Sequence, residues 1–341
     1  MAANNLRIVA CYIVKNEAKD LWLSLKSVKN SVDDIVVVDT GSTDDTANVA
    51  REFNTRIFSY EWQDDFAAAR NFALDRIAGD WAVFLDADEY FSPQTADNLR
   101  NVIERQNDNT NVVLTNRVDI DEKGDVLLSL YVPRIFRLMR NLRYIGAIHE
   151  ELRQKGEFVT GVKAAKPNEL TLIHTGYAGE RGVLKARRNL KILLKEFKSE
   201  NEPERLYGYI AEAYDGLNDR ENAIKYAYLD IKRGRQPVTY ASRSYRILMA
   251  RLAENPVDNE ERIRVARLAV HDFPELPEFY AEYAEALAAW RLYDEAVKAM
   301  GMALSLAVNY RGLEPSVYND DMGKVWEKRV EFWEKKVKGD R

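Results

Sequence analysis

The pattern of apolar and polar positions changes about half-way along the chain. In the first part, short apolar runs alternate with stretches of helical periodicity. The apolar runs predict buried strands over residues 6–14, 34–38, 56–58 and 81–85. The stretches between them predict helices over residues 18–30, 43–53 and 66–77, the second capped near Ser42. Residues 112–173 are β-rich and irregular. Strand–helix alternation is typical of an α/β domain with a mainly parallel sheet covered on both faces.

From about Arg181 the periodicity is helical throughout. Residues 207–231 repeat in residues 280–304, so that alanines and tyrosines fall on matching positions. Small side chains at such positions let the two helices of a hairpin approach closely. The repeat resembles tetratricopeptide (TPR) units, and the alternative is a plain helical bundle with alanine and tyrosine seams. We expect a charged final helix over residues 322–337.

Length and composition agree with two ordinary globular domains. The chain has 341 residues, of which 46% are hydrophobic and 31% are charged. We therefore predict an α/β domain over residues 1–178 and an all-α helical-repeat domain over residues 179–341. The net charge of −5 provides no basic field that would favour nucleic acid as a partner.

Targeting and redox signals point to the cytoplasm. No apolar run approaches the roughly 18 residues of a membrane span, and residues 1–5 lack the apolar core of a signal peptide. Cys11 is the only cysteine, so no internal disulfide can form. We expect it to be a buried packing residue.

Two aspartates follow the last of the predicted parallel strands. In an extended chain, Asp86 and Asp88 share a face and Ala87 points away. Two neighbouring carboxylates repel each other unless a cation lies between them. Oxygen ligands suit Mg²⁺ or Mn²⁺, which keep other coordination positions open for phosphate.

The aspartate pair belongs to an ordered set of five motifs. They are Asn16-Glu17, Asp39-Thr40-Gly41-Ser42, Asp86-Ala87-Asp88, His149-Glu150-Glu151 and Ile173-His174. In this order and spacing they resemble the nucleotide-binding half of family 2 glycosyltransferases, which have the GT-A fold. The resemblance covers residues 6 to about 178.

The resemblance implies a role for each matched residue. The nucleotide-sugar donor would be bound by Asn16, Glu17, Asp39, Arg70 and Asp86. For Arg70 the alternative is an ordinary salt bridge on a helix surface.

The same family pattern implies a metal site and a base. Asp86 would share a Mn²⁺ or Mg²⁺ ion, Asp88 would bind it directly, and His174 would be a further ligand, with His149 as its competitor. Glu150 would be the catalytic base. Many relatives carry Glu-Asp at this motif, so the register leaves Glu151 as the alternative.

These observations predict a metal-dependent, inverting hexosyl- or N-acetylhexosaminyltransferase that uses a nucleotide sugar, by family habit a UDP-sugar. The acceptor would be a peptide, a protein or a saccharide, and the helical domain would recruit it or form a homo-oligomer. One alternative is a TPR scaffold with a degenerate transferase domain. Another is a sugar nucleotidyltransferase, although Lys15-Asn16-Glu17 stands where such enzymes carry a Gly-rich phosphate loop.

Overall fold

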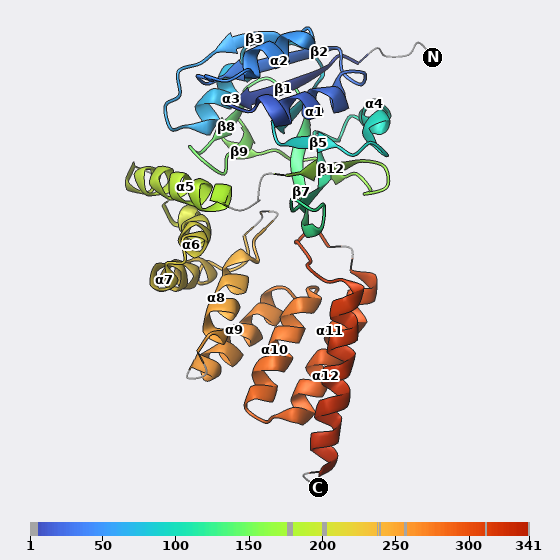
Figure 1. The fold of residues 1–341 in the computed structure, drawn as a ribbon, viewed down its shortest axis with the longest axis vertical. Coiled ribbons are helices and arrows are strands. Elements are labelled where there is room, and N and C mark those ends of the chain that lie inside the picture. The colour runs from blue at the N-terminus through green and yellow to red at the C-terminus, as the bar shows by residue number, and fades with distance from the viewer. Residues whose placement is uncertain are drawn as a thin grey trace. The chain divides into compact units, whose positions relative to one another are not determined.

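The computed structural model describes residues 6–175, 180–199, 203–236, 238, 240–255, 258–310 and 312–339. Contacts between Cα atoms divide the chain into two units, Met1–Gly182 and Val183–Arg341 (Figure 1). The predicted boundary between residues 178 and 179 lies outside the described residues.

The first unit is built on one large sheet. Among the described residues it has nine strands in the order β3-β2-β1-β4-β7-β6-β12-β5, and β11 pairs with β6. Four strands are mutually parallel: β1 (Ile8–Val14), β2 (Asp34–Asp39), β3 (Arg56–Ser59) and β4 (Trp81–Asp86). The rest of the sheet contains β5 (Glu89–Phe91), β6 (Val112–Ile120), β7 (Val126–Arg137), β11 (Val162–Ala164) and β12 (Thr171–His174). Strand β7 is antiparallel to both β4 and β6, so the sheet is mixed.

A small second sheet has the order β10-β9-β8. Its strands are β8 (Leu142–Ile145), β9 (Glu151–Gln154) and β10 (Glu157–Phe158). It lies next to α3 (Phe66–Leu74), because the side-chain amide of Asn71 exchanges two hydrogen bonds with the backbone of Tyr144.

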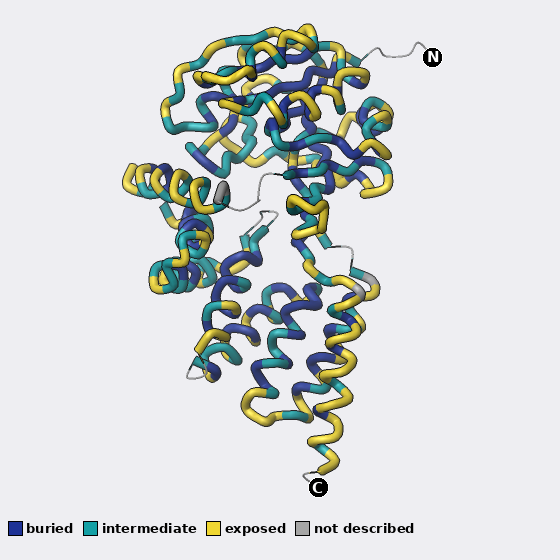
Figure 2. Tube along the Cα trace, viewed as in Figure 1, coloured by how far each residue is buried: buried dark blue, intermediate teal, exposed yellow. Residues whose placement is uncertain are grey.

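Helices cover both faces of the large sheet. Alternate residues of β1 face opposite ways: Ile8 and Ala10 join the core beneath α1 (Ala18–Val28) and α4 (Leu99–Glu104). Val9 and Cys11 join the core beneath α3. Figure 2 shows buried residues gathered along these strands. The predicted α/β class is thus confirmed, and Cys11 is fully buried, which raises the pKa of its thiol.

Two local predictions were wrong. The second helix, α2 (Thr46–Glu52), begins later than the expected cap at Ser42. The reason is that the carboxylate of Asp39 accepts hydrogen bonds from the N–H groups of Gly41 and Ser42, which holds these residues in a turn. Likewise, the extended conformation does not continue to Asp88, because β4 ends at Asp86 and a turn follows in which Ala87 is buried.

The second unit is all α. Its helices are α5 (Glu180–Ser199), α6 (Tyr207–Gly216), α7 (Arg220–Ile231), α8 (Arg243–Ala253), α9 (Asn259–Asp272), α10 (Pro277–Ala289), α11 (Tyr293–Asn309) and α12 (Asp320–Gly339). The repeated segments form the hairpins α6–α7 and α10–α11, and each helix from α6 onward packs against the next. The matched alanines Ala211 and Ala284, and Ala223 and Ala296, are all fully buried. The predicted helical-repeat organisation is therefore confirmed. Within the described part of the chain, no helix combines the length and the apolar character that crossing a membrane requires.

Candidate active site

Three neighbouring strands end at the same edge of the large sheet. Strands β2, β1 and β4 are adjacent and parallel, so the residues that follow them lie close together. Such edges are where ligands bind on open α/β sheets. Asp39 ends β2, Asn16 and Glu17 follow β1, and Asp86 ends β4.

The loop after β1 is tied to the loop after β2. Asn16 has a φ of 56°, a left-handed conformation that asparagine tolerates better than most residues. Its N–H donates to Oγ of Ser42 at 3.0 Å, and its Oδ1 accepts from the N–H of Thr43 at 2.7 Å. The N–H of Glu17 donates to Oγ1 of Thr46 at 2.8 Å. The two loops therefore form one connected rim.

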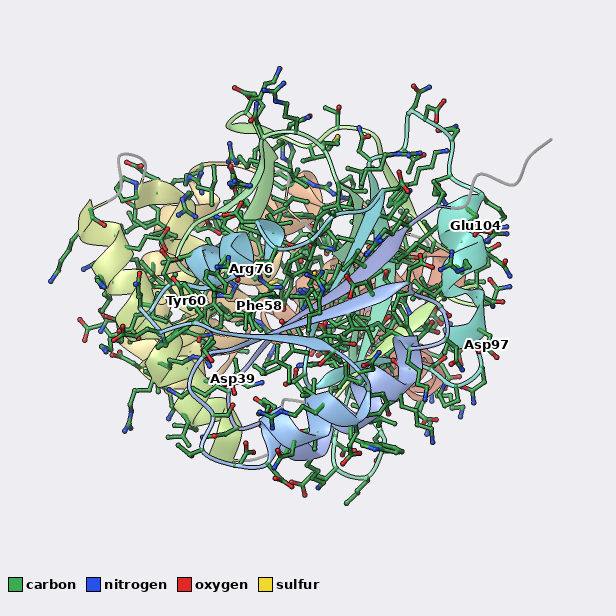
Figure 3. All side chains as sticks on the ribbon, turned by 90° about the horizontal axis from the view of Figure 1, so that it is seen from above. Asp39, Phe58, Tyr60, Arg76, Asp97 and Glu104 are labelled. Atoms are coloured by element: carbon green, nitrogen blue, oxygen red, sulfur yellow. The ribbon has the colours of Figure 1, made fainter. Side chains whose placement is uncertain are left out.

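Asp39 lies on this rim, and its backbone carbonyl accepts a hydrogen bond from the N–H of Tyr60. Figure 3 shows Asp39 close to Tyr60 and far from Asp97 and Glu104, which lie on the opposite side of the view. A surface pocket of about 470 Å³ occurs on that opposite side and is lined by Asn98, Asn101, Glu104, Arg105, Asn168 and Glu169. Arg105 and Glu169 already form a salt bridge there, at 3.2 Å. Because none of the predicted site residues lines it, this pocket is not the candidate site.

Asp86 accepts from two arginines. Nη2 of Arg70 lies 2.9 Å from its Oδ1, and Nη2 of Arg134 lies 2.5 Å from its Oδ2. Burial would raise the pKa of Asp86, but Arg134 and Arg70 outweigh it, so the pKa is far below its usual range. Arg134 also contacts the fully buried Glu89 at 2.6 Å. The second carboxylate oxygen of Glu89 accepts from the N–H of Asp86 at 3.2 Å, which fixes the turn after β4.

Arg70 connects the aspartate to the predicted base. Its side chain is only 8% exposed, and its Nε donates to Oε1 of Glu150 at 2.8 Å. Burial would lower the pKa of Arg70, but Glu150 and Asp86 raise it well above its ordinary value and keep the guanidinium charged. The same guanidinium lies over the rings of Phe84 and Tyr144. The alternative of an exposed helix-surface salt bridge is therefore wrong for Arg70.

Helix α3 determines where Glu150 lies. The N–H of Phe66, at the first residue of α3, donates to the carbonyl of Ala147 at 2.8 Å. His149 has a φ of 53°, which turns the chain just before Glu150. Glu151 is already the first residue of β9, and its carboxylate pairs with Arg153 at 2.5 Å. The two adjacent glutamates thus have different partners, and it is Glu150 that reaches Arg70.

Asp88 lies beside His174. Nε2 of His174 is 3.4 Å from Oδ2 of Asp88, and its Nδ1 is 2.9 Å from Oδ1 of Asp119. Burial alone would lower the pKa of His174, but the hydrogen bonds with Asp119 and Asp88 raise it to about 9. Asp119 itself pairs with Arg117 at 2.8 Å. The order Arg117–Asp119–His174–Asp88 fixes the orientation of the imidazole ring.

The residues around Asp88 fit a divalent ion in part. Asp88 and His174 place a hard oxygen and an imidazole nitrogen opposite each other, a donor set that suits Mn²⁺. Asp86 differs, because both of its oxygens face guanidinium groups. Within the described ranges there is no group of three or more His, Cys, Asp or Glu side chains that could hold a metal ion.

Three charged residues of this region were not among the predicted site residues. All three are buried or nearly so: Arg134 pairs with Asp86, and Asp119 pairs with His174. Glu89 pairs with Arg134 and accepts from the N–H of Asp86. Arg134 stands inside an apolar stretch of the sequence, Tyr131-Val132-Pro133-Arg134-Ile135-Phe136, whereas Glu89 and Asp119 have other charged residues close by. A charged residue in such a stretch needs a partner when it is buried, and this signal was available from the sequence alone.

Comparisons with known proteins show which proteins this chain is similar to. A TPR repeat-containing protein of Synechococcus elongatus is 35% identical over 150 residues, which cover 44% of this chain and 36% of that protein. The SPbeta prophage-derived glycosyltransferase SunS of Bacillus subtilis is 28% identical over 223 residues, which cover 63% of this chain and 50% of that protein. The matches thus span half or less of the length of these relatives.

One solved structure with a detectable likeness is glucosyl-3-phosphoglycerate synthase from Mycobacterium tuberculosis in complex with Mn²⁺ and UDP-glucose. It is 22% identical, the match covers 35% of this chain and 45% of that chain, and the TM-score is 0.29.

The match to a family model shows which family the chain belongs to. Residues 10–185, just over half of the chain, match the family model described as Glycosyl transferase family 2. This range contains every residue predicted for the site. The chain therefore belongs to glycosyl transferase family 2.

Proposed function

We propose that this protein is a metal-dependent, inverting glycosyltransferase that moves a hexosyl or N-acetylhexosaminyl group from a UDP-sugar to a peptide, protein or saccharide acceptor. One observation carries the proposal: the guanidinium of Arg70 contacts both Asp86 and Glu150. It places the predicted base next to the predicted donor-binding aspartate, although they come from different segments. The single cysteine favours a cytoplasmic location for this reaction.

The donor would bind along the rim at the carboxyl ends of β1, β2 and β4. In the proposed arrangement, Asn16, Glu17 and Asp39 bind the nucleoside, and Asp86 and Arg70 lie nearer the diphosphate. Nη1 of Arg70 is buried and has no hydrogen-bond partner among the described residues. It therefore has a hydrogen to donate to a diphosphate oxygen, and guanidinium groups suit that geometry.

Glu150 would act on the acceptor. Its carboxylate takes the proton of the acceptor hydroxyl while the hydroxyl oxygen attacks the anomeric carbon. The bond from that carbon to the diphosphate oxygen breaks in the same step, so the configuration at the anomeric carbon is inverted. Arg70 keeps Glu150 oriented until the proton is transferred.

Asp88 and His174 would hold Mn²⁺ or Mg²⁺. When bound, the ion would stabilise the negative charge that develops on the leaving diphosphate. Asp119 positions His174 by accepting from its Nδ1, so that Nε2 faces Asp88.

A panel of nucleotide sugars tests the proposal directly. Each is titrated into the protein by calorimetry with Mn²⁺ present, and those that bind are then assayed for release of the nucleotide diphosphate. We expect one sugar to bind more tightly than the others and to be turned over. Binding without any turnover, with water or with added acceptors, would favour a degenerate transferase domain on a scaffold instead.

A further inference from the structure

A short segment between α11 and α12 crosses the start of two other helices. We call residues 312–319 the strap. The four residues around the starts of α8 and α10 that hydrogen-bond to it, Ala241, Ser242, Arg246 and Glu278, are the strap seat. Glu314 and Pro315 of the strap are buried. The seat is formed where α8 and α10 begin, within the second unit.

The carboxylate of Glu314 caps α8. It accepts from the N–H groups of Ala241 and Ser242, each at 3.1 Å. Ser242 is the N-cap residue of α8, and its own side chain makes no capping hydrogen bond. The strap therefore supplies a negatively charged acceptor at the N-terminal end of α8, where such a charge is favourable.

The seat also contacts the main chain of the strap. Nη2 of Arg246 donates to the carbonyl of Pro315 at 2.5 Å. Oε1 of Glu278 accepts from the N–H of Val317 at 2.5 Å and from Oγ of Ser316 at 2.6 Å. Main-chain contacts of this kind, combined with one side-chain anchor, are how extended peptides are recognised.

One acceptor in the seat is left over. Glu278 is only 6% exposed, and its Oε2 is buried without a hydrogen-bond partner among the described residues. A buried carboxylate oxygen without a donor is costly. A ligand with one more donor than the strap would satisfy it.

Between its ends the strap buries Pro315 but leaves its larger apolar side chains exposed. Leu313 and Val317 are both exposed, at 48% and 39%. The apolar anchors lie at its borders, where Tyr310 packs in the α8–α10 core and Tyr318 lies 5.2 Å from the ring of Trp326. The middle of the strap is thus held by the buried Pro315 and by polar contacts, both of which a competing peptide can reproduce.

We propose that the strap seat is a binding site for an extended peptide that carries a carboxylate directly before a proline, and that the strap occupies it as a built-in competitor. The occupant to which the chemistry points is a peptide segment of another protein, because the seat makes hydrogen bonds with the main chain and with one carboxylate of its occupant. That this peptide is an acceptor segment rests on the proposed glycosyltransferase function. The binding itself does not depend on it.

The test uses the full chain and a fluorescein-labelled peptide with the sequence of residues 312–319. In the wild type the strap competes, so the peptide should bind weakly. In Glu314→Gln, which loosens the strap but leaves the seat intact, anisotropy should show binding at least tenfold tighter. A peptide with glutamine in place of its glutamate should bind Glu314→Gln no more tightly than it binds the wild type. The original peptide should likewise bind weakly to the double variant Glu314→Gln, Arg246→Met.

Equal binding to the wild type and Glu314→Gln, or no binding to either, would overturn the proposal. If Glu314→Gln fails to fold, Pro315→Gly loosens the strap while keeping the cap, and the same comparison applies. Light scattering tests whether the strap of a second copy occupies the seat instead. A doubled mass for Glu314→Gln would show this and overturn the proposal. UDP-sugar binding by calorimetry should be unchanged in every variant, so a failure here is distinct from a failure of the proposed function.

Discussion

Arg70 and Glu150 lie 80 residues apart in the sequence, yet Nε of Arg70 donates to Oε1 of Glu150 at 2.8 Å. The other side of the same guanidinium reaches Asp86 at 2.9 Å. One buried cation therefore holds two carboxylates, from β4 and from the turn before β9, in a fixed relation. In the proposed function this relation aligns the base with the donor.

Replacing Arg70 by lysine should separate the two carboxylates. Lysine keeps the charge but is a single point of contact that cannot donate to both groups with fixed geometry. Because small misplacements at a reacting centre are costly, we expect turnover to fall about 100-fold. Steady-state kinetics would measure this. The matched control is Arg76→Lys, since Arg76 stacks on Phe72 and has no contact with Asp86 or Glu150 among those described. Equal rates for both variants would contradict the bridging role of Arg70.

The two adjacent glutamates should behave differently. Glu150→Gln keeps the shape and the acceptor oxygen for Arg70 but removes the basicity, so turnover should fall by about 10²–10⁴-fold. Donor affinity should be nearly unchanged, and the acidic limb of the pH–rate profile should flatten. Glu151→Gln is the matched control and should have a much smaller effect, because Glu151 pairs with Arg153. If Glu151→Gln is the more damaged enzyme, the register of the motif is shifted by one residue.

His174 should make the stability of the metal-free protein depend on pH. Its pKa is about 9 in the folded protein and 6.5 ordinarily, so the folded state binds its proton more tightly. This contribution is fully present below about pH 6.5 and is lost as the pH rises through 9, and it amounts to roughly 3 kcal/mol. Urea unfolding in EDTA at several pH values would measure it.

The control for this measurement is His174→Gln, in which the pH-dependent component should disappear. Asp119→Asn should reduce it, because Asp119 is a partner of the protonated ring. Identical pH dependence in the wild type and His174→Gln would show that the imidazole is not held as described.

The sequence alone predicted some parts of the fold and the candidate site, and not others. The strands β1, β2 and β4 were predicted because continuous apolar runs mark buried parallel strands, and Asp39 and Asp86 follow directly from their ends. The partners of these residues depend on β6 and β7, whose pairing is antiparallel and has register shifts. A shift of one residue reverses every side chain of a strand, so neither Arg134 nor Asp119 could be assigned to the site from periodicity.

The start of α2 and the turn after β4 could not be predicted from the sequence, because both depend on hydrogen bonds between side chains and the backbone. The sequence suggested Ser42 as a helix cap, but its N–H donates to Asp39 and its Oγ accepts from the N–H of Asn16. With Ser42 held in this way, the helix begins only at Thr46. In the same way, the extended alternation predicted for Asp86 and Asp88 fails because Glu89 pulls the chain into a turn through the N–H of Asp86. Local patterns do not contain either of these contacts.

The alanine seam of the second unit should tolerate no larger side chain. Ala284 is fully buried in α10, where that helix packs against α11. Ala284→Leu should lower the free energy of unfolding by about 1–3 kcal/mol through overpacking. Ala289→Leu, at the exposed end of the same helix, is the matched control and should change it little. Equal stability of the two variants in chemical denaturation would argue against close packing at this seam.

The central claim is that the edge formed by β1, β2 and β4 binds a nucleotide diphosphate together with a divalent ion. Calorimetric titration of UDP, first with Mn²⁺ and again after EDTA, tests it most directly. The proteins compared are the wild type, Asp88→Asn and the control Asp97→Asn. Figure 3 shows Asp97 on the opposite side of the view from Asp39. The account predicts that the wild type and Asp97→Asn bind UDP at least tenfold more tightly with Mn²⁺ than after EDTA, and that Asp88→Asn loses this difference while remaining folded. UDP binding that is equally tight after EDTA, or a metal effect that survives in Asp88→Asn, would contradict it.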